Sequence, residues 1–194
     1  MDYQMAKVAI KTDNPYVLNV LGAPFGDGPQ DQDYQKEWFT DQTDFWLDRI
    51  GTRPVTYFHG FEEAEPSVIG IERRYWKASD GVHFEVELFK DNPLAIKVWE
   101  AAQAGVAFAS TGAISHMVRP IERGGAIEIW PIGELALIDG RTHRPANIRA
   151  RVEVARAKAT FAAAGLELPK EVAEAPDRAQ RIARLKARAK LTLY

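Results

Sequence analysis

The chain has 194 residues, 46% of them hydrophobic, and a formal net charge of −2. This length fits one compact domain with an appendage, and the hydrophobic content is enough for a core. Cysteine is absent, which excludes disulfides, thiolate metal sites and cysteine catalysis, and no stretch approaches the roughly 18 apolar residues of a membrane span.

The first half of the chain predicts short β-structure separated by loops. Strands are expected at residues 7–11, 16–21, 54–59, 68–71, 74–76 and 83–89. Residues 22–30 are rich in Gly and Pro and predict a loop. Residues 31–48 combine aromatic and acidic side chains, so we expect this stretch to pack on the core through its aromatics. Ser79-Asp80-Gly81 predicts a tight turn before a half-buried strand of alternating polarity.

The second half begins with a helix and returns to β-structure. Asn92-Pro93 predicts a helix start, and Gly105 predicts its end. Strands are expected at residues 106–113, 126–130 and 134–138. Because most of the predicted strands are close neighbours in sequence, antiparallel pairing is favoured over a doubly wound parallel sheet.

The composition changes from residue 145 onward. Two helices are expected over residues 146–164 and 173–191. Residues 149–194 hold 11 Lys/Arg and 5 Asp/Glu, so a basic tail follows an acidic body. We therefore expect a domain over residues 1–148 and a basic helical C-terminal extension over residues 149–194.

Several kinds of site are missing from the sequence. It has no HExxH motif and no Cys/His cluster, no phosphate-binding Gly-rich loop before a helix, and no GxSxG elbow. We therefore expect neither a metal nor a cofactor. What remains is a serine on one predicted strand and a histidine at the end of another.

Three blocks of the chain, in order, resemble the tailed-phage prohead proteases. The histidine block is Tyr57-Phe-His-Gly-Phe61 followed by Pro66-Ser-Val-Ile-Gly70. The serine block is Gly105-Val-Ala-Phe-Ala-Ser-Thr-Gly-Ala113. The third is Ile129-Trp-Pro-Ile-Gly-Glu-Leu-Ala-Leu-Ile-Asp139, followed by Arg144-Pro-Ala-Asn147. The three blocks stand in order at familiar spacing, and the resemblance covers roughly residues 15 to 150.

The resemblance implies a fold and an activity. The family is similar in fold to herpesvirus assemblin, which implies an α+β fold: a mainly antiparallel β-barrel ringed by helices. It implies a serine endopeptidase that cleaves the phage scaffold protein and major capsid protein precursors, and itself, inside the immature prohead in the host cytoplasm. A homo-oligomer is expected, without a membrane partner. The alternative is a catalytically inactive capsid-assembly or scaffold protein of the same fold.

The resemblance also implies the catalytic residues. A serine hydroxyl needs an imidazole to take its proton, and the imidazole needs a third group at its other nitrogen. Ser110 is the expected nucleophile, His59 the expected base and Glu134 the expected third group. His116 and His143 are the alternatives to Glu134. Each residue also has an ordinary structural interpretation, such as a core hydroxyl or a strand-end acid.

An oxyanion hole is needed as well. Assemblins use an arginine in a loop soon after the third catalytic strand, so Arg141 and Arg144 are candidates here. The backbone N–H groups of Thr111 and Gly112 are rival donors. Ala136 stands where many members of the family have Ser, which should not affect the chemistry.

The basic residues from Arg178 to Lys190 leave three interpretations open. They form a solvated helix face, dock onto acidic scaffold or capsid subunits, or bind nucleic acid. No base-stacking aromatic side chains accompany this charge, so nucleic acid is the least favoured partner.

Overall fold

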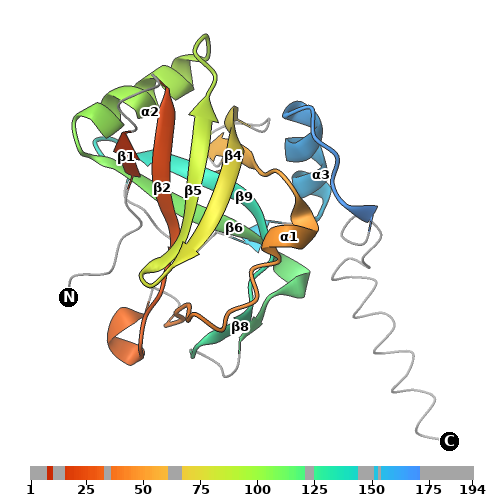
Figure 1. The fold of residues 1–194 in the computed structure, drawn as a ribbon. Coiled ribbons are helices and arrows are strands. Elements are labelled where there is room, and N and C mark those ends of the chain that lie inside the picture. The colour runs from red at the N-terminus through yellow and green to blue at the C-terminus, as the bar shows by residue number, and fades with distance from the viewer. Residues whose placement is uncertain are drawn as a thin grey trace, which may run out of the picture.

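The computed structural model describes residues 8–10, 16–32, 36–60, 67–120, 125–143, 151–152 and 154–170. In these residues the fold is α+β: a mostly antiparallel, nearly closed, barrel-like sheet with few helices (Figure 1). The main sheet has eight described strands in the order β1-β2-β5-β4-β3-β9-β6-β10, and β7 and β8 form a small second sheet.

The elements have the following bounds. The strands are β1 Val8–Ile10, β2 Val17–Pro24, β3 Pro54–Tyr57, β4 Val68–Ala78, β5 Gly81–Leu88, β6 Ala107–Ile114, β7 Arg119–Pro120, β8 Ile127–Ile129, β9 Ile132–Asp139 and β10 Arg151–Val152. The α-helices are α1 Leu47–Ile50, α2 Pro93–Gln103 and α3 Val154–Ala163. The 3-10 helices are η1 Pro29–Asp31, η2 Phe58–Gly60 and η3 Ser115–Met117.

Two pairings in the sheet are parallel. β3 pairs parallel with β9, and β10 pairs parallel with β6, whereas the other described pairings are antiparallel. The parallel pairs join strands far apart in sequence, where a long connection can return the chain in the same direction. The expectation of a mainly antiparallel sheet is therefore confirmed, with these two parallel contacts within it.

The β4–β5 hairpin follows the sequence pattern closely. Ser79 and Asp80 form the turn, and Gly81 begins β5 with a φ of 149°. The inward positions of β5 are buried and alternate with partly exposed ones. The two strands expected at residues 68–71 and 74–76 are instead one strand, because β4 pairs with β5 on both sides of a bulge near Glu72.

β2 continues further than expected. A loop is expected from residue 22, but Ala23 and Pro24 pair with the start of β5, and Gly22 lies at a register shift between Leu21 and Ala23. Gly22 makes this possible, since a Cβ there would lie 2.7 Å from the ring of Phe84 and 3.2 Å from Cγ2 of Thr111 on β6. The missing side chain thus lets β2 approach β6, and the sheet nearly closes.

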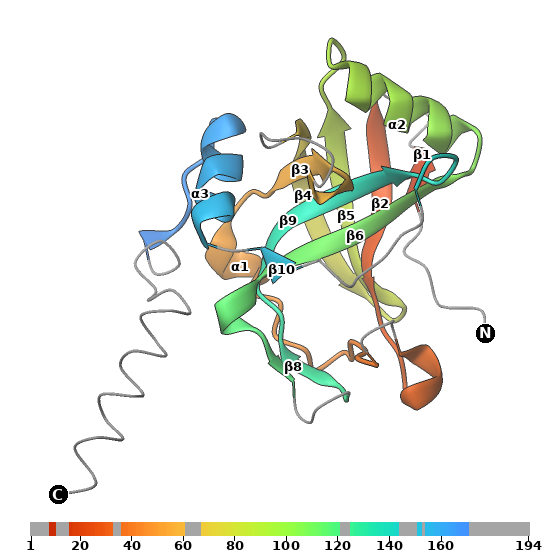
Figure 2. The same cartoon turned by 180° about the vertical axis from the view of Figure 1, so that it is seen from behind.

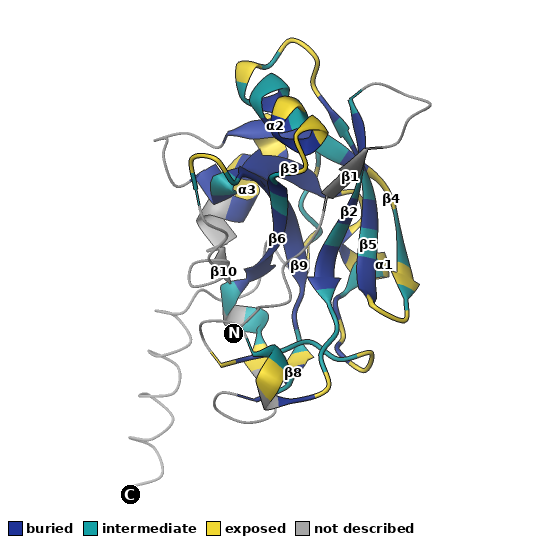
Figure 3. Cartoon of the chain, turned by 90° about the vertical axis from the view of Figure 1, so that its left-hand side faces the viewer, coloured by how far each residue is buried: buried dark blue, intermediate teal, exposed yellow. Residues whose placement is uncertain are grey.

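Helix α2 forms as its sequence predicts and covers one end of the sheet. The side chain of Asn92 accepts hydrogen bonds from the N–H groups of Leu94 and Ala95, which caps the helix. Small apolar residues of α2 are buried in the core, while its other side is exposed (Figure 3). The chain leaves the helix at Gly105, whose φ is 70°.

The aromatic stretch also packs as expected over its described residues. Phe45 lies in the main core, and the Phe39 ring makes edge contacts with the rings of Phe45 and Trp130. Trp46 packs against a second apolar cluster formed around Ile114 and Ala157.

The chain beyond residue 148 contributes to the packed structure. β10 pairs with the last two residues of β6, and α3 buries Ala157, Thr160 and Phe161. In place of the helix expected over residues 146–164, the structure has the strand β10 and then the shorter helix α3. Both elements follow the expected domain boundary at 148/149; β10 pairs with β6, and α3 is partly buried. The helix expected at residues 173–191 and the basic residues 178–190 lie outside the described residues. No helix within the described ranges has the length and apolar character needed to cross a membrane.

Candidate active site

The described candidate residues lie on or directly after three neighbouring strands, β3, β9 and β6, which lie side by side in Figure 2. The register sets Ala136 of β9 opposite both Thr56 of β3 and Ser110 of β6. Alternate residues of a strand point to opposite faces, and directly paired residues share a face. Leu135 and Leu137 of β9 belong to the main core. The row that contains Ser110 therefore lies on the other face of the sheet.

Glu134 lies on the same face as Ser110, two residues before Ala136 on β9. Ser110 and Glu134 are therefore diagonal neighbours across the β6–β9 pair, a relationship with a typical separation of about 7–8 Å. Both are buried, with exposed fractions of 3% for Ser110 and 2% for Glu134. A residue of β6 and a residue of β9 are thus brought together in one buried patch.

His59 joins this patch through Glu134. The Nδ1 atom of His59 lies 2.7 Å from Oε1 of Glu134, and both side chains are 2% exposed. An ionised carboxylate only accepts hydrogen bonds, so Nδ1 is the donor. This arrangement fixes the tautomer of the imidazole, and the negative charge would stabilise an imidazolium. The other ring nitrogen, Nε2, is also buried.

The backbone of η2 sets the position of His59. Phe58 and His59 have φ values of 45° and 56°, in the left-handed region that non-glycine residues rarely adopt. Each such residue costs about 1–2 kcal/mol. These two residues end β3 abruptly and turn the chain, so that His59 meets Glu134 rather than continuing beside the end of β9. Strained residues of this kind cluster at functional sites.

A small residue, Ala136, lies on β9 between the β3 side and the β6 side of the candidate site. Ala136 is the residue of β9 that lies between β3 and Ser110 in the register. An imidazole that comes from the β3 side and is held by Glu134 has to lie over β9 to approach β6. A methyl side chain at position 136 leaves room for the ring there.

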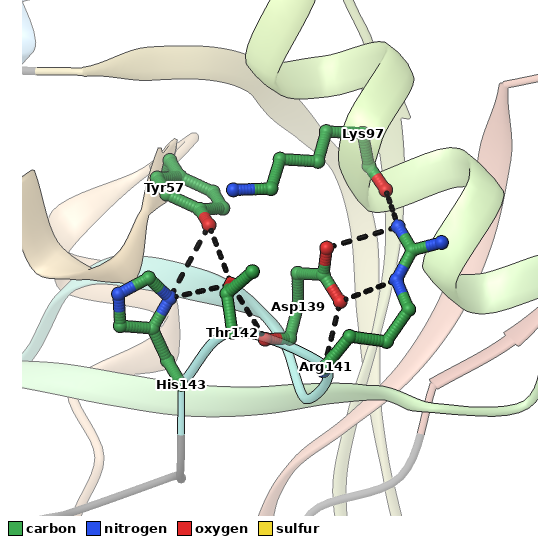
Figure 4. Close-up of polar contacts among 6 residues, drawn as sticks. All are labelled: Tyr57, Lys97, Asp139, Arg141, Thr142 and His143. Atoms are coloured by element: carbon green, nitrogen blue, oxygen red, sulfur yellow. Dashed lines mark hydrogen bonds and ion pairs between the residues drawn. The ribbon is translucent and has the colours of Figure 1, made fainter.

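The oxyanion candidates are placed differently from one another. Arg141 is bound to Asp139: its Nε lies 2.9 Å from Oδ1, and its Nη2 lies 2.9 Å from Oδ2 (Figure 4). Hydrogen bonds from the Arg141 side chain hold the pKa of Asp139 below its ordinary value of 3.8. Asp139 pairs with Ala107, three residues before Ser110, which is about 10 Å along the strand. The guanidinium of Arg141 is therefore bound to Asp139, at some distance along the sheet from Ser110.

The backbone donors lie closer to the serine. Thr111 follows Ser110 on β6, and its Oγ1 accepts a hydrogen bond from Nε1 of Trp130 at 3.1 Å on the core side. Only the backbone N–H of Thr111 is thus a candidate donor. Gly112 shares the face of Ser110 and pairs with Glu134. Arg144 lies outside the described residues.

The two alternative histidines follow the ends of β6 and β9. His116 belongs to η3, which follows the end of β6. The Nδ1 atom of His143 is 2.7 Å from Oγ1 of Thr142 and 3.4 Å from the hydroxyl of Tyr57. Among the expected partners of His59, the structure therefore brings Glu134 to the imidazole.

Some residues around the site were not singled out in the sequence. The rings of Phe58 and His143 are in tilted contact, and the carbonyl of Asp139 accepts backbone hydrogen bonds within the turn that carries His143. Asp139-Gly140 is a turn signal in the sequence, but no local pattern indicates that this turn contacts η2. Within the described ranges, no group of three or more acidic, His or Cys side chains is arranged to hold a metal ion.

Comparisons of the chain with protein-family models, with curated proteins and with solved structures find no match.

Proposed function

We propose that this chain is a serine endopeptidase of the prohead protease type, with an assemblin-like barrel. The observation that carries the proposal is the buried contact between His59 and Glu134, on the face of the sheet where the register sets Ser110 diagonal to Glu134. The three residues are those that the resemblance indicates, and they are separated by up to 75 residues in the chain.

The chemistry of this triad is acyl transfer. His59 removes the proton from Oγ of Ser110 as the oxygen attacks the carbonyl carbon of a peptide bond. Glu134 holds the imidazole and stabilises its positive charge. The C–N bond then breaks as the imidazolium protonates the leaving amine. Water, deprotonated by His59, attacks the acyl-enzyme and releases Ser110. The proposed donor to the oxyanion is a backbone N–H of Thr111 or Gly112, whichever of the two points away from β9, because consecutive N–H groups of a strand point to opposite edges.

The proposed substrates are the phage scaffold protein and the major capsid protein precursor, together with the protease itself. The enzyme would act as a homo-oligomer inside the immature prohead, in the host cytoplasm. The mechanism requires no metal or cofactor, because the proton transfers use the imidazole and the carboxylate of this chain.

The test compares two buried serines. Ser110→Ala should leave scaffold and capsid precursors uncut when the proteins are co-expressed, and should abolish labelling by a fluorophosphonate. Loss of a catalytic serine typically lowers kcat by about 10⁶-fold. Ser67→Ala is the matched control, because Ser67 is also buried and lies outside the proposed triad. Precursor cleavage that survives in Ser110→Ala would refute the proposal.

A catalytically inactive assembly protein of the same fold is the second candidate. The low exposure of Ser110 and His59, 3% and 2%, favours it, since a peptide has to reach the serine. This candidate predicts that the fluorophosphonate does not label the wild-type protein and that precursor processing is the same in wild type and Ser110→Ala. Labelling of Ser110 in the wild type would exclude it.

A further inference from the structure

The turn that carries His59 needs a restraint from outside itself. Phe58, His59 and Gly60 have successive φ values of 45°, 56° and 61°. This conformation is unfavourable for the two non-glycine residues, so it persists only where the surroundings hold it. Glu134 contacts the ring of His59, but a contact at the end of a side chain does not fix the backbone of the turn.

His143 contacts both residues that precede His59. Its ring lies 4.3 Å from the ring of Phe58, at an interplanar angle of 33°. The ring of Tyr57 meets it edge-on, with the centroids 6.0 Å apart at 86°. Such aromatic contacts contribute through area and geometry together. One ring thus packs against the last residue of β3 and the first residue of the left-handed turn.

The turn on which His143 sits is itself well fixed. The carbonyl oxygen of Asp139 accepts hydrogen bonds from the N–H groups of Thr142 and His143 and from the hydroxyl of Thr142. The carboxylate of Asp139 binds the backbone and the side chain of Arg141. Figure 4 shows the bonds from the Thr142 hydroxyl and from Arg141 converging on Asp139. Asp139 is 1% exposed and is the last residue of β9.

Glu134, which contacts the imidazole, and His143, which contacts Phe58, therefore belong to one stretch of chain. Glu134 lies within β9, and His143 lies in the turn directly after it. The side chain of His59 contacts β9 at Glu134. The backbone turn that carries His59 contacts the turn after β9, because Phe58 packs against His143.

We propose that His143 is a positioning residue for His59. Its ring, packed against Phe58, holds the left-handed turn so that the imidazole of His59 meets Glu134. This inference rests on the proposed function for its catalytic consequence. The orientation of His59 can be measured independently of any activity.

The experiment compares His143→Ala with His143→Phe. The phenylalanine keeps a ring on Phe58 and removes the hydrogen bonds of the imidazole, whereas alanine removes both. His83→Ala is the control, because His83 also stacks on an aromatic ring, that of Trp76, but on β5. Near-ultraviolet circular dichroism checks that each variant is folded.

Two readouts separate positioning from general stability. The first is the downfield proton signal of His59 Nδ1–H in ¹⁵N-histidine-labelled protein, assigned by its loss in His59→Gln. The second is the rate at which a fluorophosphonate labels Ser110. In His143→Ala the signal should disappear through exchange, and labelling should fall by about 10- to 100-fold, since small misplacements of catalytic groups have effects of this size. His143→Phe should restore the signal and a labelling rate within about threefold of wild type.

The positioning role is overturned if His143→Ala keeps both the Nδ1–H signal and the wild-type labelling rate, or if His143→Phe behaves like His143→Ala. A wild-type protein that the probe never labels refutes the proposed function instead. The proton signal then decides the positioning role alone: its loss in His143→Ala and its return in His143→Phe support the role.

Discussion

Glu134 and His59 meet at 2.7 Å in a place where both side chains are 2% exposed. The second carboxylate oxygen of Glu134, Oε2, is buried and has no hydrogen-bond partner among the described residues. Burying a carboxylate costs free energy of folding unless its charge is paired or hydrogen-bonded. The contact with His59 therefore accounts for the presence of an acid at this position of β9.

Glu134→Gln should keep the fold and greatly reduce catalysis. Glutamine has nearly the same shape, but it carries no charge to stabilise an imidazolium and can favour the wrong tautomer. A comparable change in a catalytic triad lowers kcat by about 10⁴-fold. The rate of fluorophosphonate labelling measures the effect, and Glu128→Gln on the exposed side of β8 is the control. Equal labelling in both variants would show that Glu134 does not assist His59.

Position 136 should tolerate serine and reject a large side chain. Ala136 is opposite Ser110 and fully buried, so a leucine would occupy the space through which the imidazole approaches the serine. We expect a fluorophosphonate to label Ser110 of the Ala136→Ser variant at close to the wild-type rate. In Ala136→Leu the labelling should be at least about 100-fold slower, because misplacement of catalytic groups has effects of this size. Urea unfolding of both variants separates this effect from overpacking, which costs about 1–3 kcal/mol. A reactive, stable Ala136→Leu protein would contradict this geometry.

Arg53 should be essential for stability rather than activity. Its guanidinium is fully buried, lies 2.9 Å from Oε2 of Glu72, and donates to the carbonyl oxygens of Trp46, Leu47, Gly51 and Ile132. Removing one partner of a buried ion pair costs about 3–5 kcal/mol. Arg53→Met should lower the free energy of unfolding by that amount, as measured in urea. The double variant Arg53→Met/Glu72→Gln should recover part of the loss, because no buried charge is then left alone. A double variant no more stable than the single one would count against this explanation.

The stabilising effect of Asp139 should depend on pH. Its pKa in the folded protein is below 3.8, because the Arg141 side chain donates hydrogen bonds to the carboxylate. Between the folded and unfolded pKa values the unfolded chain binds more protons, so stability falls as the pH falls. The contribution is therefore complete above pH 3.8 and is lost as the pH drops through the folded value.

Asp139→Asn tests this directly. The variant should be less stable than wild type near neutral pH, and the difference should shrink progressively as the pH falls below 3.8. Urea unfolding of both proteins at several pH values from about 6 to about 2.5 gives the comparison. A difference that is the same at every pH would assign the effect to lost packing or to the turn geometry, and not to the charge.

Phe161 should be part of the main folding unit. It belongs to α3 and is 1% exposed, although residues from 149 onward were expected to form a separate extension. Truncation of a buried phenylalanine costs about 3–5 kcal/mol. Phe161→Ala should therefore lower the unfolding midpoint of the whole domain, followed through the tryptophan fluorescence of the barrel, whereas Lys158→Ala at an exposed position of the same helix should not. If Phe161→Ala leaves the midpoint unchanged, α3 is an independent appendage.

Local sequence patterns determined the elements whose stability depends on near neighbours. The alternation of residues 83–89 predicts β5, Ser79-Asp80-Gly81 predicts the turn before it, and Asn92-Pro93 predicts the start of α2. In each case the deciding interactions, a hairpin pairing or a cap, join residues a few positions apart. The resemblance in three short blocks indicated Ser110, His59 and Glu134, but it could not show which acid or histidine meets the imidazole.

Only the tertiary structure decided the arrangement of the site. The parallel pairing of β3 with β9 and the ring contact of Phe58 with His143 join segments about 80 residues apart. Such contacts are specified by packing and by strand register, which no local pattern of residues encodes. For the same reason Arg141, expected near the serine, is instead held by Asp139, and the chain beyond residue 148 joins the barrel through β10 and α3.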